Sequence, residues 1–417
     1  MFEPVVPAMR RPRRFAGEHS PGSLRAVAGS FLVAVLVTLA LVPRAEAAPL
    51  SKADQEFVDS TVSAAMSAAK TPGLSIVISG PKGEYSKSYG WARMGWILNS
   101  MKLTHHVRIG SVTKSFTAIA ILQQIEQGTL KFSDTLDEFV TGIKYGNEIT
   151  VRDLLAMQSG VYEWQSDPSF QAAVVANPKM KWEPEDSVEL IRKNEPEFKP
   201  GEYVHYNSSN YTLLGLILED VTGETAEAAI TKNVIEPLAL SQTSLPAPTA
   251  SEPIPYKLPE PFAHGYNRYV LGVPTDTTDF NARIAWTMGG IQSTVGGLAA
   301  FGQGLGTGAL LSPEMFAEQQ QFCAAGAWSY GGPSKFGYGL GLMSLGDWVG
   351  HPGSVPGFSA VTFYDPNTGA EISVVENLQS TNISAFSSVF QKIASHLYPE
   401  SMETPEYPGS PECPPAL

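Results

Sequence analysis

The chain has 417 residues, of which 43% are hydrophobic and 17% charged, and its formal net charge is −13. This length and composition support a sizeable buried core, in one large or two smaller domains, and exclude a globally disordered chain. An acidic chain repels phosphates and anionic lipid, so nucleic acid is excluded as an expected partner.

The first 47 residues have the pattern of a secretory signal peptide. Five arginines between residues 10 and 25 precede an uncharged apolar run over residues 26–42, and Ala45-Glu46-Ala47 follows as a small-x-small cleavage site. An uncleaved anchor is the alternative, but the run is shorter than the roughly 20 residues that span a bilayer. We therefore predict a secreted or periplasmic, cell-envelope protein that contacts a membrane only during export.

The segment after the signal peptide predicts a helix followed by two paired strands. Residues 51–70 carry an apolar helical stripe with Ser51 as a cap, and Thr71-Pro72-Gly73 ends the helix. Two short strands follow over residues 74–79 and 84–91, joined by a tight turn.

The region between residues 112 and 289 is mainly helical in pattern. Helices are expected over residues 114–127, 151–157, 187–193 and 211–222, and a proline-rich loop over residues 246–261. The last part of the chain returns to strands, over residues 336–345, 347–350, 358–364 and 370–376, and ends in a helix over residues 383–397.

These elements predict an α+β fold. Strands joined by tight turns pair antiparallel, so both chain ends are expected in one antiparallel sheet flanked by the first and last helices. Residues 48–111 and 290–398 would form this sheet domain, residues 112–289 a large inserted helical domain, and residues 399–417 a Pro-rich, extended tail. The crevice between the two domains is the expected site.

Cysteine and histidine are used sparingly. Cys323 and Cys413 are the two cysteines of the chain, and in an oxidising compartment they form either a disulfide or two separate thiols. His105 and His106 are adjacent, as in a polar loop, and no pair of residues has the spacing of zinc ligands. We therefore predict no metal and no other cofactor.

The motif with clear chemistry is Ser111-Val112-Thr113-Lys114, placed at the start of a predicted helix. Residues three apart lie on one helix face, so the lysine amine can reach the serine hydroxyl. A serine needs a base to become a nucleophile, and a buried lysine can be neutral at neutral pH and act as that base. The helix N-terminus favours negative charge that develops nearby.

A second copy of the pattern, Ser67-Ala68-Ala69-Lys70, lies at the end of the first predicted helix. One Ser-x-x-Lys is expected by chance in a chain of this size. Ser111 is favoured because Arg108-Ile109-Gly110 precedes it and a long apolar helix follows, whereas Ser67 has no glycine before it.

Residues 108–117 resemble the first motif of the serine β-lactamase and penicillin-binding protein (DD-peptidase) superfamily. The resemblance points to the branch of class C β-lactamases, exported D-alanyl-D-alanine carboxypeptidases and related esterases. Further matches follow in the order of the family, at residues 154–160, 200–201, 206–215, 289–294, 338–341 and 351–353.

The resemblance implies a role for each matched residue. Ser111, Lys114 and Tyr206 would be catalytic, with Tyr206 relaying a proton to the leaving group. The backbone amides of Ser111 and Ser354 would form the oxyanion hole. Ser208, His351 and Gly353 would bind the substrate, with His351 in place of the usual lysine of the third motif and Gly353 allowing close approach.

Two positions depart from the family pattern. The second motif, Tyr-x-Asn, has Ser208 in its third position, and Asn207 or Asn210 could compensate for the missing asparagine. The third motif has Pro352 where the family has threonine, and a proline is tolerated in a strand only at a sheet edge. Both changes weaken the case for a conventional peptide or β-lactam substrate.

The resemblance implies an exported serine hydrolase that acts through an acyl-enzyme on cell-wall peptides or related amides, as D-alanyl-D-alanine carboxypeptidases and β-lactamases do. The expected partner is a small-molecule or peptide substrate, such as a peptidoglycan stem peptide. An esterase and a non-catalytic penicillin-binding or peptidoglycan-sensing protein are the alternatives. An α/β-hydrolase is excluded because the chain contains no Gly-x-Ser-x-Gly.

Overall fold

The computed structural model describes residues 48–95, 99–267, 275–324, 336–379, 385–403 and 413. The predicted signal peptide lies outside these residues. The helices are α1 (Lys52–Ala69), α2 (Thr113–Glu126), α3 (Val151–Leu155), α4 (Pro168–Ala176), α5 (Pro184–Lys193), α6 (Ser209–Thr222), α7 (Ala226–Ile230), α8 (Ala282–Gly289), α9 (Val295–Gly306), α10 (Pro313–Gln319) and α11 (Ala385–Leu397). Short helical turns lie at Gly110–Val112, Leu136–Glu138, Trp164–Ser166, Thr231–Ile235 and Glu400–Met402.

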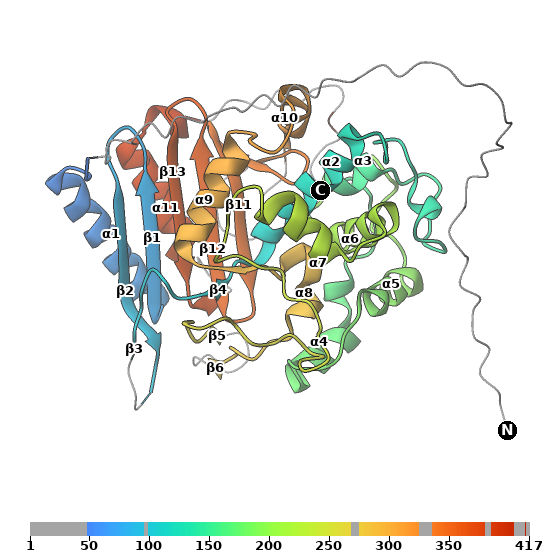
Figure 1. Cartoon of the computed structure of the whole chain (residues 1–417), viewed down its shortest axis with the longest axis horizontal. Helices are drawn as coiled ribbons and strands as arrows, with labels where there is room; N and C mark the ends of the chain where they lie inside the picture. The colour runs from blue at the N-terminus through green and yellow to red at the C-terminus, as the bar shows by residue number, and fades with distance from the viewer. Residues whose placement is uncertain are drawn as a thin grey trace, which may run out of the picture. The chain divides into compact units, whose positions relative to one another are not determined.

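Nine strands form one antiparallel sheet in the order β3-β2-β1-β13-β12-β11-β10-β9-β8 (Figure 1). These strands are β1 (Gly73–Ser79), β2 (Tyr85–Arg93), β3 (Asn99–Ser100), β8 (Cys323–Ala324), β9 (Phe336–Tyr338), β10 (Met343–Leu345), β11 (Trp348–Val355), β12 (Phe358–Asp365) and β13 (Ala370–Glu376). Two small sheets contain β4 (Val107–Arg108), β5 (Tyr266–Asn267), β6 (Thr275–Asp276), β7 (Gln292–Ser293) and β14 (Leu378–Gln379). Because β1 pairs with β13, the early and late parts of the chain share one sheet, as predicted.

Helices cover both faces of the large sheet. Neighbouring residues of a strand point to opposite faces, and on β12 Phe363 stacks on Phe390 of α11, with 4.8 Å between ring centroids. Its neighbour Thr362 points to the opposite face and packs against Gly302 of α9. The contact is so close that a Cβ atom on Gly302 would lie 2.0 Å from Thr362 Oγ1. Helix α1 packs beside α11, so the predicted first and last helices cover one face and α9 the other (Figure 1).

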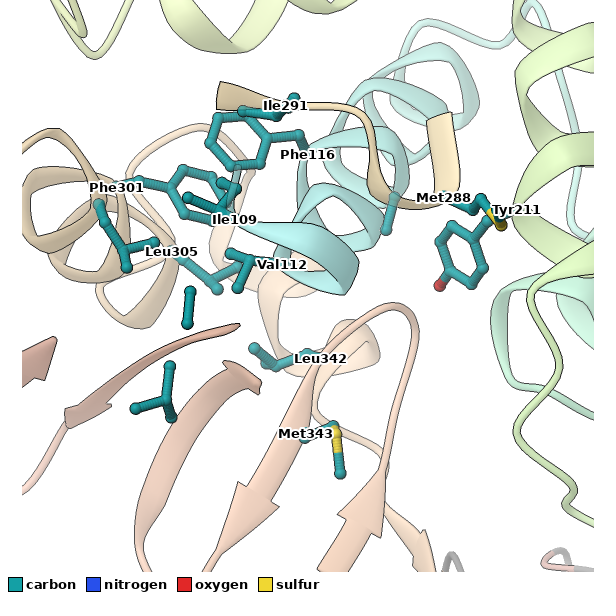
Figure 2. Close-up of a cluster of buried hydrophobic side chains, with 14 of the residues drawn as sticks. Ile109, Val112, Phe116, Tyr211, Met288, Ile291, Phe301, Leu305, Leu342 and Met343 are labelled. Carbon is teal, nitrogen blue, oxygen red and sulfur yellow. The ribbon is translucent and has the colours of Figure 1, made fainter. Parts of the chain in front are cut away.

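A hydrophobic core lies beneath the N-terminus of α2 (Figure 2). Val112 contributes from the turn before α2, Phe116 from α2, and Phe301 and Leu305 from α9, and all four are 1% exposed or less. The rings of Phe116 and Phe301 are stacked, with 3.5 Å between centroids. This packing fixes the start of α2, where the Ser111 motif lies, between the sheet and the helices α3 to α8. The four helices expected between residues 114 and 222 are present as α2, α3, α5 and α6.

The strand pattern near the end of the chain differs from the expectation in two places. The single run predicted over residues 336–345 is a hairpin of β9 and β10, because Gly341 has a φ of +69° and turns the chain. The strand predicted over residues 347–350 extends to Val355 as β11. Strand β10 pairs with β11 only up to Gly350, so Pro352 lies in the part of β11 that forms a sheet edge, where a proline is tolerated.

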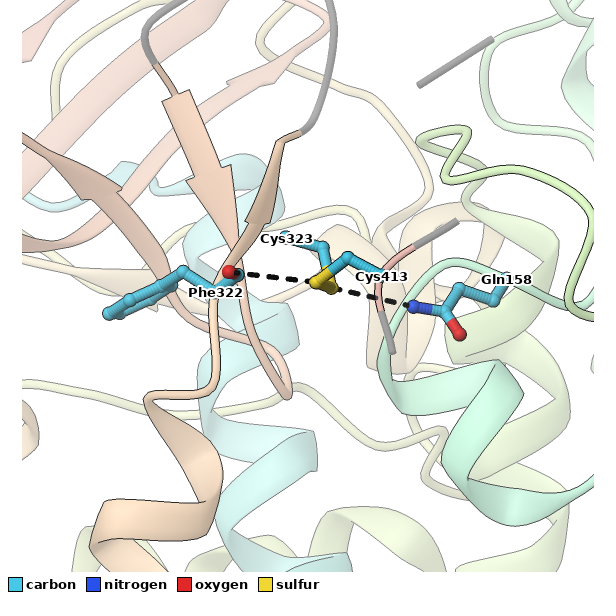
Figure 3. Close-up of a disulfide and its surroundings, with 4 residues drawn as sticks. All are labelled: Gln158, Phe322, Cys323 and Cys413. Atoms are coloured by element: carbon cyan, nitrogen blue, oxygen red, sulfur yellow. Dashed lines mark hydrogen bonds between the residues drawn. A yellow bond between two sulfur atoms is a disulfide. The ribbon is translucent and has the colours of Figure 1, made fainter. Parts of the chain in front are cut away.

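The two cysteines, for which the sequence left two possibilities, form a disulfide (Figure 3). It joins Cys323 on β8 to Cys413 in the C-terminal segment, with 5.5 Å between Cα atoms. The beginning of this segment is a helical turn rather than extended chain, and the buried Ser401 donates a hydrogen bond to Asp365. Residues 404–412 and 414–417 lie outside the described residues.

The described residues belong to one compact unit. The division into a sheet domain and an inserted helical domain stays a prediction. None of the helices in the described part of the chain is both long and apolar enough to cross a bilayer.

Candidate active site

Ser111 lies in the tight turn Gly110–Val112 that leads into α2. Gly110 has a φ of +55°, and a Cβ atom there would lie 2.6 Å from the amide nitrogen of Ser354. On the facing strand, a Cβ atom on Gly353 would lie 1.9 Å from the carbonyl oxygen of Ile109. The two glycines therefore let two backbones touch, and this contact brings Ser354 beside Ser111.

Lys114 is fully buried, one helical turn after Ser111. Its Nζ atom lies 3.1 Å from Ser111 Oγ, 3.4 Å from Ser208 Oγ and 2.9 Å from the carbonyl oxygen of Met288. Burial lowers the pKa of Lys114 to about 7, against an opposing influence of the Glu163 carboxylate. A substantial fraction of this amine is therefore neutral near pH 7, and the neutral amine can accept the Ser111 proton.

Glu163 is a member of the site that the sequence did not reveal. Its carboxylate accepts hydrogen bonds from the amides of Ser208, at 2.5 Å, and Gln165, at 3.1 Å. Burial raises the pKa of Glu163, and these two amides and Lys114 oppose the rise. Its sequence signal is weak, since it is a single acidic residue between two aromatic residues.

Tyr206 lies against the base and against two further rings. Its ring centroid is 4.9 Å from Lys114 Nζ, 5.9 Å from the ring of Tyr338 and 6.1 Å from that of His351. Tyr338 is the last residue of β9, just before the turn at Gly341. Tyr206 is therefore close enough to the reacting centre for the predicted proton relay, which stays a prediction.

His351 has no exposed surface. Burial, and to a lesser extent the nearby Lys114, lowers the pKa of His351 to about 3, so its imidazole is neutral. Its Nδ1 atom donates a hydrogen bond to the carbonyl oxygen of Pro352. The predicted substrate contacts of His351 and Gly353 stay predictions, and the structure gives Gly353 a separate reason to be glycine, its contact with Ile109.

Of the polar side chains at positions 207, 208 and 210, that of Ser208 is the one that contacts Lys114. The side chain of Asn207 bonds to Val161 O and to the amide of Ser209, and Asn210 bonds to Ser159 and to the backbone of Asn207. Both asparagines are thus engaged in local structure. The Ser208 hydroxyl contacts Lys114, and the hydrogen bonds of the two asparagines go to other groups, so compensation by an asparagine stays a prediction.

A cavity of about 260 Å³ opens beside the nucleophile. Ser111, Lys114, Ser208 and Ser354 line it, which places both proposed oxyanion-hole residues at one cavity wall. Larger cavities lie between β1, β2 and the start of α9, and beside the disulfide. We locate the active site in the smaller one because its lining contains the nucleophile and its base.

Within the described ranges, no group of three or more His, Cys, Asp or Glu residues could hold a metal ion.

The fold and the pair of Ser111 and Lys114 define a β-lactamase-like serine hydrolase. The chain matches the family described as Beta-lactamase over residues 58–387, and it belongs to that family. Protein flp of Staphylococcus aureus is 31% identical over 202 residues, which are 47% of this chain and 39% of that protein. The chain thus matches about two fifths of the length of that relative.

Two solved structures have the same fold. A D-stereospecific amidohydrolase from Streptomyces sp. is 26% identical with a TM-score of 0.68, over 81% of this chain and 98% of that one. An octameric penicillin-binding protein homologue from Pyrococcus abyssi is 27% identical with a TM-score of 0.69, over 84% of this chain and 79% of that one. The predicted superfamily and fold class are therefore confirmed.

Proposed function

We propose that the protein is an exported hydrolase that forms an acyl-enzyme on Ser111 and cleaves D-alanyl cell-wall peptides or related amides, like a D-alanyl-D-alanine carboxypeptidase. The observation that carries this proposal is the 3.1 Å contact between Ser111 Oγ and the buried amine of Lys114. A buried amine with a lowered pKa is a suitable base for a serine nucleophile.

The reaction would proceed in two halves. Neutral Lys114 takes the proton of Ser111, and Oγ attacks the substrate carbonyl, whose oxyanion is stabilised by the amides of Ser111 and Ser354. The tetrahedral intermediate then expels the amine, which takes a proton delivered through Tyr206. Water attacks the acyl-enzyme in the second half, loses its proton to the same groups, and releases the carboxylic acid and free Ser111.

The choice of amide substrates is supported by the relatives. The Streptomyces neighbour is named a D-stereospecific amidohydrolase, and the site here contains the nucleophile and base that such chemistry requires. An esterase is the second candidate, and Ser208 favours it. A serine hydroxyl offers fewer hydrogen bonds than the asparagine amide of the family motif, and an ester has no N–H group that needs a partner.

Covalent labelling tests the proposal. We expect a fluorophosphonate and a fluorescent penicillin to label wild-type protein at Ser111, and Ser111→Ala to abolish labelling. A substrate panel of a D-Ala-D-Ala peptide, nitrocefin and a p-nitrophenyl ester then separates peptidase, β-lactamase and esterase. A folded protein that binds penicillin reversibly, without labelling or turnover, would instead be a non-catalytic binding protein.

A further inference from the structure

The cavity beside Ser111 has an apolar wall. Val174 is half-buried and the other side chains of this wall are at most 6% exposed. The wall consists of Phe170 and Val174 from α4, Phe280 from the segment before α8, and Ile284, Ala285 and Met288 from α8. Apart from Ser111 and Lys114, the polar side chains among the described lining residues are the uncharged Gln165, Ser208, Ser354 and Gln379.

One side of this wall is held by aromatic packing. The ring of Phe170 makes an edge contact with Trp164, with 4.6 Å between centroids, and lies 5.0 Å from the ring of Trp182. Trp164 is fully buried, and its indole N–H donates to Thr212 on α6. The α4 side of the cavity therefore rests on the helical core.

The other side is held by Arg108, which is buried three residues before the nucleophile. Its guanidinium donates to the carbonyl oxygens of Phe280 at 3.0 Å, Thr278 at 2.7 Å and Tyr256 at 2.6 Å. The same guanidinium lies 6.0 Å from the ring centroid of Phe280. The pocket is thus preformed on both sides, as ligand pockets usually are.

The cavity lies on one side of the reacting centre. A leaving group has to be next to the group that gives it a proton, which is Tyr206 in the proposed reaction. Tyr206 packs on Tyr338 and His351, and none of these three residues lines the cavity. The space beside Ser111 is therefore suited to the acyl part of the substrate, which stays bound after the leaving group has left.

We infer that this pocket binds the acyl group of the substrate and selects acyl groups with bulky apolar or aromatic parts over small ones such as acetyl. The inference rests on the proposed acyl-enzyme at Ser111, and among the peptides and related amides of that proposal it favours those whose acyl part is large and apolar. An apolar cavity of about 150 Å³ holds a benzene ring, so the 260 Å³ available here accommodates a phenyl group.

A series of p-nitrophenyl esters tests this inference, because the leaving group stays constant while the acyl group grows from acetyl through butyryl and hexanoyl to phenylacetyl. Each kcat/KM is divided by the rate constant of alkaline hydrolysis of the same ester. We expect a rise of about fourfold per buried methylene, and phenylacetyl more than tenfold above acetyl. A flat or falling series would overturn the inference.

Two neighbouring valines of α4 give a matched pair of variants. Val174 lines the cavity, whereas Val175 is 62% exposed and does not. We expect Val174→Asp to lower the ratio of phenylacetyl to acetyl kcat/KM about tenfold, and Val175→Asp to leave this ratio unchanged. Equal effects of the two variants on this ratio would contradict the assignment of Val174 to the wall of the acyl pocket.

A second variant covers the case in which Val174→Asp fails to fold. Ile284→Ala enlarges the pocket without adding charge, and we expect it to shift the preferred acyl chain towards greater length. Fluorophosphonate labelling is measured in parallel. Protein that is labelled but shows no preference among acyl groups overturns only the inference that the pocket selects the acyl group. Protein that is neither labelled nor active on any ester overturns both this inference and the proposed function.

Discussion

The Nζ atom of Lys114 lies 2.9 Å from the carbonyl oxygen of Met288, a residue 174 positions later in the chain. Helix α8 presents this oxygen just after a kink at Trp286, whose φ of 33° and ψ of −128° are not helical. The Trp286 indole donates to the buried Glu227 at 2.9 Å. A strained backbone near the base is thus held by a separate hydrogen bond, as is common at functional sites.

The two Ser-x-x-Lys copies are expected to behave differently. Ser67 and Lys70 are exposed at the end of α1, where Lys70 adopts a left-handed backbone conformation, whereas Ser111 and Lys114 are in contact. We expect Ser111→Ala to lose covalent labelling and Ser67→Ala to keep it, as seen by fluorescence in a gel. The reverse result would refute the assignment of the nucleophile.

The pH dependence of kcat/KM is expected to follow Lys114. Since the neutral amine is the base, activity rises with pH and reaches half its plateau near the Lys114 pKa of about 7. Glu163 raises this pKa, so Glu163→Gln is expected to move the acid limb to lower pH. The exposed Glu148 serves as a control, and Glu148→Gln is expected to leave the profile unchanged. An unmoved limb in Glu163→Gln would exclude the electrostatic coupling.

Tyr206 and Lys114 are expected to matter for chemistry rather than for folding. We expect Tyr206→Phe and Lys114→Ala each to lower the acylation rate by roughly 10²–10⁴, the range for a positioned proton-transfer group. Stopped-flow acylation with a chromogenic ester measures the rate, and circular dichroism checks the fold. An unchanged rate in Tyr206→Phe would make Tyr206 a packing residue, held between Lys114 and Tyr338.

Ser208 is expected to influence the choice between esters and amides. Its hydroxyl lies 3.4 Å from Lys114 Nζ and offers one donor, whereas an asparagine there would offer two donors and an acceptor. A site that leaves a substrate amide unpaired loses about 1–3 kcal/mol. We expect Ser208→Asn to shift the ratio of kcat/KM values towards amides, measured with a matched anilide and ester. A shift towards esters would contradict this role.

Glu371 is expected to make stability depend on pH. This carboxyl is buried between α9 and β13, accepts hydrogen bonds from Thr362 and Ser373, and has its pKa raised by burial from 4.5 to about 8. Between these two values the folded protein holds a proton that the unfolded chain has lost, so stability falls as the pH rises from about 4.5 to about 8. We expect Glu371→Gln to weaken this loss, with calorimetric Tm values at pH 5 and pH 8 as the measurement. An equal drop in Tm for both proteins would contradict the raised pKa.

Local signals explain most of what the sequence predicted. The helix over residues 51–70, the longer strands of the sheet and the Ser111–Lys114 pair follow from periodicity and spacing within a few residues, whereas the two-residue strands β3 and β8 were not predicted. The contacts of Lys114 with Met288 and of Arg108 with Phe280 join segments far apart in the chain, so no local pattern could reveal them. The hairpin of β9 and β10 was missed because an apolar run masks its turn, although the left-handed Gly341 marks the place.

The disulfide between Cys323 and Cys413 lies at the outer edge of the large sheet. Strand β8 is its outermost strand on one side, and an uncovered outer strand is a template on which a second chain can add itself by backbone hydrogen bonds. Covalent attachment of the C-terminal segment at Cys323 keeps part of the protein's own chain beside this strand, with Cys413 Sγ near the Phe322 carbonyl (Figure 3). The bond thereby fixes a residue 90 positions later in the sequence at the outer edge of the sheet.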